Sequence, residues 1–215
     1  MSAPPPSSPE TPEPPRSSAP LALGSALNLP NLITLSRLVL SLVLFAMMSL
    51  TDWWLASATL FVVAASTDFL DGYIARKYGL VTVLGRIMDP FVDKVIVCGA
   101  FVFLLPLVKS GVTAWMAILV IGREMLVTSL RSFLEQMGKD FSASWSGKVK
   151  MGLQCVAVTA SLLSLSPAVR EHQTLNAIIG LRDVLLWSAV AATVYSGYIY
   201  VQRAVLLVRE VSHSK

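Results

Sequence analysis

Charged residues are scarce in this chain: Asp, Glu, Lys and Arg make up only 14% of its 215 residues, whereas hydrophobic residues make up 54%. The mean hydropathy of +0.66 is too high for a soluble domain built around one core. The hydrophobic residues form long runs, and the chain has room for about six spans of roughly 20 residues each. This composition excludes a soluble fold and predicts an all-α, polytopic membrane protein.

Cysteine is nearly absent as well, since only Cys98 and Cys155 occur, both in apolar runs. A disulfide between them is left open in principle, but buried free thiols fit such positions better.

Dense positive charge is also missing. The net charge is only +4, and the basic residues are scattered over the ends of the hydrophobic runs. This distribution argues against nucleic acid as a partner and for anionic lipid headgroups or phosphates.

The first 27 residues differ in composition from the rest. The segment 1–20 contains eight prolines separated by Ser, Thr and Glu. Such a segment buries too little apolar surface to become ordered. It has no basic start followed by an apolar core, and its single arginine and two glutamates do not fit a mitochondrial transit peptide. We therefore expect a disordered tail over 1–27, without a catalytic role, and a membrane domain over 28–215.

Six hydrophobic segments follow the tail, and turn-forming or charged residues separate them. Their ranges are 32–50, 53–67, 92–108, 113–134, 149–165 and 184–208. With six spans both termini lie on one side of the membrane, and most Lys and Arg residues fall on that side, which identifies it as the cytoplasm. We therefore expect six transmembrane helices with both termini in the cytoplasm.

Four aspartates occur within 26 residues, where two of the hydrophobic segments meet: Asp68, Asp71, Asp89 and Asp93. Residues three or four apart share a helix face, so each pair points in one direction. Acids near a bilayer are costly and indicate function. Four converging carboxylates would repel each other unless cations lay between them, and such oxygen ligands suit Mg²⁺ or Mn²⁺. The spacing predicts a divalent-metal site near the cytoplasmic surface.

Small residues and one arginine accompany these aspartates. Gly72, Ala75 and Gly85 would let a flat base or ribose approach the helix backbone, although close helix–helix packing explains them equally well. Arg76 can reach a phosphate, or serve as a positive anchor at the membrane surface. Two metal ions about 3.5–4 Å apart would clamp the pyrophosphate of a nucleotide-linked lipid and stabilise an in-line displacement.

The full pattern from Asp68 to Asp93, Asp-x2-Asp-Gly-x2-Ala-Arg-x8-Gly-x3-Asp-x3-Asp, resembles the signature of the CDP-alcohol phosphatidyltransferases. The resemblance implies a six-helix, usually homodimeric membrane enzyme with two divalent cations. In it a CDP-linked lipid gives its phosphatidyl group to an alcohol and CMP is released. It further implies metal ligands at Asp68, Asp71, Asp89 and Asp93, a catalytic base at Asp93, and CDP-binding positions at Asp68, Asp71, Gly72, Ala75, Arg76 and Gly85. We expect a bacterial inner (cytoplasmic) membrane as its location.

Other stretches are similar to one branch of that family, the CDP-diacylglycerol–glycerol-3-phosphate 3-phosphatidyltransferases: residues 28–37, 122–124 and 146–150. This branch makes phosphatidylglycerophosphate and CMP from CDP-diacylglycerol and sn-glycerol 3-phosphate, in anionic phospholipid biosynthesis. Glycerol 3-phosphate is a dianion and needs several cations, so we expect it to contact Thr34, Arg37, Arg123, Lys148 and Lys150. Arg123 lies inside an apolar run and needs an anionic partner, for which Glu124 and the aspartates are alternatives to a substrate phosphate.

Two other functions stay open at this point. The same fold could use another acceptor, such as phosphatidylglycerol in a cardiolipin synthase, or inositol phosphate or serine. An ion-coupled transporter is a more remote alternative, because acids within spans also mark ion pathways. Transporters usually place such charges near the midplane and show repeat symmetry, and the sequence shows neither feature.

Overall fold

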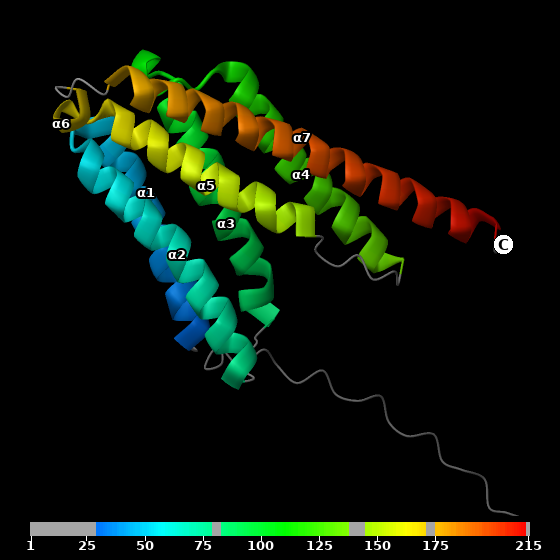
Figure 1. Cartoon of the computed structure of the whole chain (residues 1–215). Helices are drawn as coiled ribbons and strands as arrows, with labels where there is room; N and C mark the ends of the chain where they lie inside the picture. The colour runs from blue at the N-terminus through cyan, green and yellow to red at the C-terminus, as the bar shows by residue number, and fades with distance from the viewer. Residues whose placement is uncertain (1–28, 79–82, 138–144, 171–174, 214–215) are drawn as a thin grey trace, which may run out of the picture.

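A computed structural model describes residues 29–78, 83–137, 145–170 and 175–213 of the chain (Figure 1). The predicted tail over 1–27 lies outside these residues. The described part is all-helical, which confirms the predicted fold class. Its elements are α1 (Leu29–Leu50), α2 (Trp54–Tyr78), α3 (Val83–Leu104), the 3-10 turn η2 (Val108–Ser110), α4 (Ala114–Gln136), α5 (Trp145–Leu165), α6 (Pro167–Arg170) and α7 (Leu175–His213).

The long helices form a bundle in which consecutive helices run in opposite directions (Figure 1). α1 packs against α2 and α3, while α5 packs against α2 and α7, and α4 lies along α7. The end of α2 and the start of α3 lie at one end of the bundle, and the short α6 lies at the opposite end. This topology brings both halves of the aspartate motif to the same end.

The core of the bundle is apolar and tightly packed between α1 and α3. A Cβ atom on Gly99 would lie only 2.2 Å from Cζ of Phe45, so the two helices approach each other where α3 has no side chain. The Phe45 ring also stacks on Phe103, with ring centroids 4.8 Å apart. Because this contact fixes α3 against α1, it also fixes the register of the polar residues that precede it on both helices.

Three of the described helices are long and apolar enough to cross a membrane: Leu32–Leu50, Trp145–Leu165 and Leu175–Leu207. A shorter apolar stretch, Trp54–Thr67, begins α2. The helices α2, α3 and α4 have 25, 22 and 23 residues, enough length for a span, but each carries several charged side chains. The structure is thus that of a membrane protein with several helical spans, and six crossings stay a prediction.

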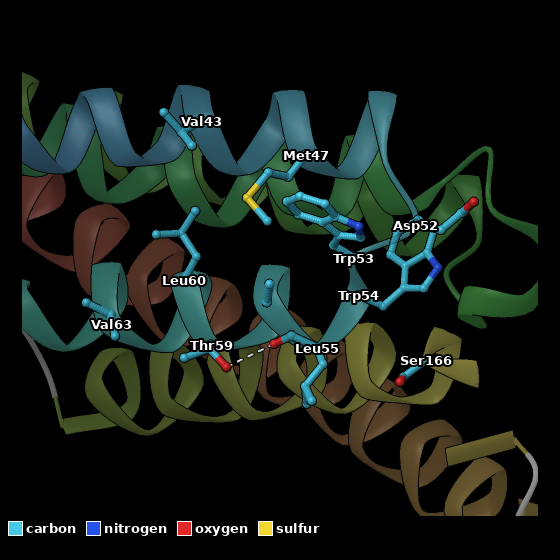
Figure 2. Close-up of a pocket in the computed structure, with 11 residues that line it drawn as sticks. Val43, Met47, Asp52, Trp53, Trp54, Leu55, Thr59, Leu60, Val63 and Ser166 are labelled. Atoms are coloured by element: carbon cyan, nitrogen blue, oxygen red, sulfur yellow. Dashed lines mark hydrogen bonds between the residues drawn. The ribbon is translucent and has the colours of Figure 1, made fainter. Parts of the chain in front are cut away.

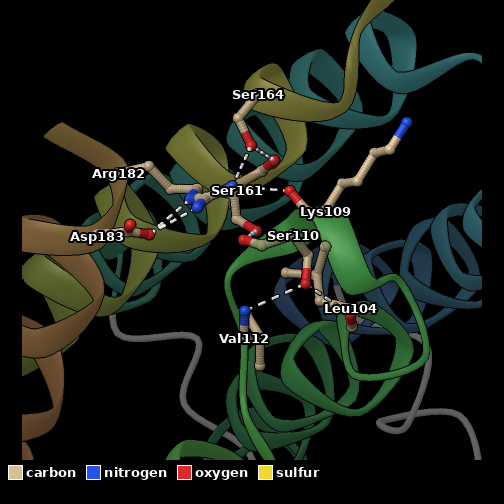
Figure 3. Close-up of polar contacts among 8 residues, drawn as sticks. All are labelled: Leu104, Lys109, Ser110, Val112, Ser161, Ser164, Arg182 and Asp183. Atoms are coloured by element: carbon tan, nitrogen blue, oxygen red, sulfur yellow. Dashed lines mark hydrogen bonds and ion pairs between the residues drawn. The ribbon is translucent and has the colours of Figure 1, made fainter. Parts of the chain in front are cut away.

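Helix α7 begins nine residues before the last predicted hydrophobic segment, 184–208. α7 begins at Leu175 and has 39 residues, about 58 Å at the α-helical rise. Arg182 lies within it because its charge is satisfied locally (Figure 3). Its guanidinium donates to the carbonyl of Lys109 over 2.7 Å and pairs with Asp183 over 2.7 Å. The helix is therefore longer than the apolar segment that predicted it, since a paired arginine need not interrupt a helix.

Further hydrogen bonds join η2, α5 and α7 around Arg182 (Figure 3). The hydroxyl of Ser161 donates to the carbonyl of Ser110 over 2.7 Å, and that of Ser110 donates to the carbonyl of Leu104 over 2.8 Å. Gly111 has a φ of 77°, and a Cβ there would also lie 2.7 Å from Nε of Arg182. Glycine is thus required for both conformation and space. These contacts hold η2, α5 and α7 together at the end of the bundle that lies opposite the aspartates.

Candidate active site

The aspartate motif occupies the last turns of α2 and the first turns of α3. Asp68 and Asp71 precede the end of α2 at Tyr78, and Asp89 and Asp93 follow the start of α3 at Val83. The two helices contact each other. Both halves of the motif were predicted to be helical, and this is confirmed. The structure describes only the backbone at seven motif positions, so the roles of their side chains stay predictions: Asp68, Asp71, Gly72, Ala75, Arg76, Gly85 and Asp89.

Asp93 is the motif aspartate whose side chain the structure describes, and it pairs with Arg37. The Nη1 atom of Arg37 lies 2.7 Å from Oδ1 of Asp93. The arginine side chain is 1% exposed and the aspartate side chain 25% exposed. The contact joins α1 to α3 two turns from the close approach of Phe45 and Gly99. Arg37 therefore orients the carboxylate of Asp93, and its predicted contact with a substrate phosphate stays a prediction.

A second charged group lies between α4 and α5. Nη1 of Arg123 donates to Oε1 of Glu124 over 3.1 Å, and Nζ of Lys150 donates to the same oxygen. The side chains of Arg123, Glu124 and Lys150 are only 10%, 12% and 5% exposed. Of the partners that the sequence allowed for Arg123, the structure selects Glu124.

Helix α7 also contacts Arg123. Nη2 of Arg123 donates to the hydroxyl of Ser196 over 2.5 Å, and Cζ of Arg123 lies 5.3 Å from the ring centroid of Tyr200. At Gly197, a Cβ would come within 3.2 Å of Cγ of Arg123. A planar guanidinium over an aromatic face is a cation–π contact. Arg123 is thus held by α7 as well as by Glu124.

These α7 residues are functional candidates that the sequence analysis missed. Ser196 and Tyr200 are four residues apart, so they share a helix face, and both are buried inside an apolar run. Polar side chains on one face of a span are a signal of function or of a polar partner. That signal was present in the sequence, but their partner Arg123 is 73 residues away from Ser196.

The helix that carries Asp93, α3, contacts both helices of the second charged group, α4 and α5. Lys94, which follows Asp93 on α3, interacts electrostatically with both Asp93 and Glu124. The predicted phosphate-binding residues therefore divide between α1 and the α4–α5 pair. Thr34 is buried on α1 one turn before Arg37, whereas Lys148 is exposed in the first turn of α5. Among the described cations, Arg123 and Lys150 pair with Glu124.

An open groove of about 890 Å³ lies elsewhere, between α1 and α2 near the turn that joins them (Figure 2). Its walls are mainly apolar side chains, including Met47, Trp53 and Leu60. This turn is at the opposite end of α2 from the aspartate motif, so the groove is separate from the candidate active site.

Comparison with known proteins adds a decisive observation to this geometry. A family model of CDP-alcohol phosphatidyltransferases matches residues 27–195, which include both charged groups. The chain belongs to this family. As a CDP-alcohol phosphatidyltransferase it is a transferase of lipid metabolism, and the family predicted from the aspartate pattern is confirmed.

Individual members of the family are similar over most of their length. A Bacillus subtilis protein named CDP-diacylglycerol–glycerol-3-phosphate 3-phosphatidyltransferase is 38% identical over 187 residues, covering 80% of this chain and 93% of its own. A protein of the same name from Rickettsia bellii is 37% identical over 177 residues, with the same coverage. An Escherichia coli protein of that name is 37% identical over 135 residues, covering 61% of this chain and 74% of its own.

Proposed function

We propose that this CDP-alcohol phosphatidyltransferase transfers the phosphatidyl group of CDP-diacylglycerol to sn-glycerol 3-phosphate, giving phosphatidylglycerophosphate and CMP. The names of relatives that are 37–38% identical support this acceptor. The observation that carries the proposal in the structure is the pair of buried cations, Arg123 and Lys150, that share Glu124.

The charge of this group fits a phosphate monoester. Two buried cations, Arg123 and Lys150, share the single carboxylate of Glu124, so two positive charges minus one negative charge leave an excess of one in this group. Excess charge in the interior of a membrane protein is costly without an anion to balance it. The phosphate of glycerol 3-phosphate is a dianion and supplies the missing charge.

The same argument ranks the alternative acceptors. Serine has no phosphate, and phosphatidylglycerol carries only a singly charged diester, so neither offers two negative charges to Arg123 and Lys150. Inositol phosphate would balance them as well as glycerol 3-phosphate does. Between these two phosphorylated alcohols, the names of the relatives favour glycerol 3-phosphate.

The donor site would lie on the aspartates. Carboxylate oxygens on the adjoining helices α2 and α3 are the donor set that Mg²⁺ or Mn²⁺ prefers, and the described carboxylate of Asp93 belongs to it. When bound, two such ions would neutralise the pyrophosphate of the donor. They would be held by Asp68, Asp71, Asp89 and Asp93. The CDP group would contact Asp68, Asp71, Gly72, Ala75, Arg76 and Gly85.

Asp93 is proposed as the general base. Its carboxylate, oriented by Arg37, takes the proton of the primary hydroxyl of glycerol 3-phosphate. The hydroxyl oxygen then bonds to the phosphorus of the phosphatidyl group, while the bond from that phosphorus to the bridging pyrophosphate oxygen breaks. CMP leaves with the electron pair. Arg123 and Lys150 hold the acceptor's phosphate, so that its hydroxyl stays in position for the attack.

The proposal includes a homodimer with six transmembrane helices per chain in a bacterial cytoplasmic membrane, and an active site on the cytoplasmic side. The distribution of Lys and Arg supports this orientation, because they are concentrated on the side that holds the aspartate motif. Reporter fusions to successive loops would test this orientation. A reporter that works only outside the cytoplasm should be inactive when it is fused after residue 140, and activity there would contradict the proposal.

Product identification tests the function directly. The purified protein would receive CDP-diacylglycerol, Mg²⁺ and one acceptor at a time: glycerol 3-phosphate, inositol phosphate, serine or phosphatidylglycerol. We expect phosphatidylglycerophosphate and an equal amount of CMP with glycerol 3-phosphate. Efficient turnover with another acceptor, and none with glycerol 3-phosphate, would refute the proposal.

A further inference from the structure

Glu124 accepts hydrogen bonds from two cations on one carboxylate oxygen. Both Nη1 of Arg123 and Nζ of Lys150 donate to its Oε1. These are the two buried cations proposed above to bind the phosphate of the acceptor. A phosphate oxygen that accepts these same two hydrogen bonds would occupy the place that Oε1 of Glu124 now fills.

The contacts of Arg123 divide into two kinds. Toward α7 its partners are neutral: the hydroxyl of Ser196 at Nη2 and the ring of Tyr200 at the guanidinium face. Toward α5 its partner is an anion, the carboxylate of Glu124 at Nη1. An incoming anion can therefore replace Glu124 while α7 continues to hold the guanidinium in place.

Burial explains why these two cations need such an anion. The side chains of Arg123 and Lys150 are 10% and 5% exposed. Unpaired charges in that environment would destabilise the bundle, because water is not available to solvate them. Glu124 supplies one negative charge, enough to hold the site together but less than a phosphate dianion offers.

We propose that Glu124 is an internal counter-anion that occupies the position of a phosphate oxygen until the acceptor binds, and that the acceptor's phosphate then replaces it on Arg123 and Lys150. This inference rests on the proposed function and adds a source of specificity to it. An alcohol without a phosphate offers no anion to replace Glu124, so the two cations stay paired with the protein and the acceptor stays unbound.

The test compares Glu124→Gln with the parent enzyme. Glutamine keeps the shape and the acceptor oxygen but removes the charge, so the phosphate no longer displaces an ion pair. We expect the KM for glycerol 3-phosphate to fall about fivefold or more, the lower end of measured couplings between two binding events. The KM for CDP-diacylglycerol should stay within about twofold, because a ground-state contact acts on its own substrate.

Glu135→Gln is the matched control, since Glu135 lies on the same helix three turns later and is exposed. It should leave both KM values unchanged. Glu124→Asp keeps the charge needed for folding but shortens the side chain by one methylene. We expect it to lower the KM for glycerol 3-phosphate by a smaller factor, so the inference can be tested even if the glutamine variant does not fold.

The outcomes separate the inference from the proposed function. If the parent enzyme uses glycerol 3-phosphate but neither Glu124 variant lowers its KM, Glu124 is not a competing anion and the inference is wrong. If the parent uses inositol phosphate instead, the proposed acceptor is wrong, and the same KM comparison with inositol phosphate decides the inference. If the parent uses only an acceptor without a phosphate monoester, both are wrong.

Discussion

Replacing Tyr200 tests whether α7 positions the arginine that binds the acceptor. Tyr200 is 2% exposed, and its ring lies 5.3 Å from Cζ of Arg123. A desolvated cation–π contact of this kind contributes about 2 kcal/mol. Tyr200→Leu removes it, whereas Tyr200→Phe keeps the aromatic face. The two variants therefore separate the contact with the guanidinium from the filling of space.

The magnitude follows from that contact energy. If all of the roughly 2 kcal/mol is lost from acceptor binding, the KM for glycerol 3-phosphate rises about 30-fold, since 1.4 kcal/mol corresponds to a factor of ten. Partial reorganisation of Arg123 brings the expectation to about 5- to 30-fold for Tyr200→Leu. For Tyr200→Phe we expect a rise of about threefold or less.

The assay is CMP release at varied glycerol 3-phosphate and saturating CDP-diacylglycerol, with thermal unfolding measured in parallel. Tyr200 also packs against Val127, Leu134 and Ala204, so the leucine variant should unfold at a lower temperature. A merely structural role would lower the amount of active enzyme without changing the KM for one substrate. Equal KM values for the leucine and phenylalanine variants would refute a positioning role for the ring.

Three further predictions concern the base, the metal site and the bundle core. Asp93→Asn should lower kcat by roughly 10²–10⁴-fold, as expected for a lost general base, while CDP-diacylglycerol still binds; a kcat within a few-fold of the parent would contradict this role. EDTA should abolish CMP release and Mg²⁺ or Mn²⁺ should restore it, and turnover that survives chelation would exclude a metal-dependent mechanism. The same assay should show large losses for Asp68→Asn, Asp71→Asn and Asp89→Asn. Gly99→Ala should destabilise the protein by about 1–3 kcal/mol because its Cβ would meet the Phe45 ring. Gly122→Ala is the control, because a Cβ there meets nothing within 4 Å. Equal melting temperatures of the two variants would argue against the close approach of α1 and α3.

Local patterns in the sequence were enough to predict the helices and the aspartate motif. The motif depends on spacing within two neighbouring helices, and the helical period alone places its residues on common faces. The need of Arg123 for an anion was also predictable, because a charge in an apolar run must be paired. Its partner proved to be the adjacent residue Glu124, one of the alternatives that the sequence allowed.

Contacts between distant helices could not be predicted in the same way. Arg37 and Asp93 are 56 residues apart, and their pairing depends on the register that Gly99 and Phe45 set between α1 and α3. Arg182 lies just before the predicted hydrophobic segment 184–208, yet it belongs to α7. Its partner, the carbonyl of Lys109, is a backbone atom 73 residues away, and no side-chain pattern reveals it.

The position of Ser196 and Tyr200 also has a practical consequence for where this domain ends. The region that matches the family model stops at residue 195, in the middle of α7. A protein shortened to that boundary would keep Arg123, Glu124 and Lys150 but lose the hydroxyl and the ring that hold Arg123 from α7. The contacts that hold Arg123 therefore extend to Tyr200, about 1.4 helical turns beyond the limit that family similarity defines.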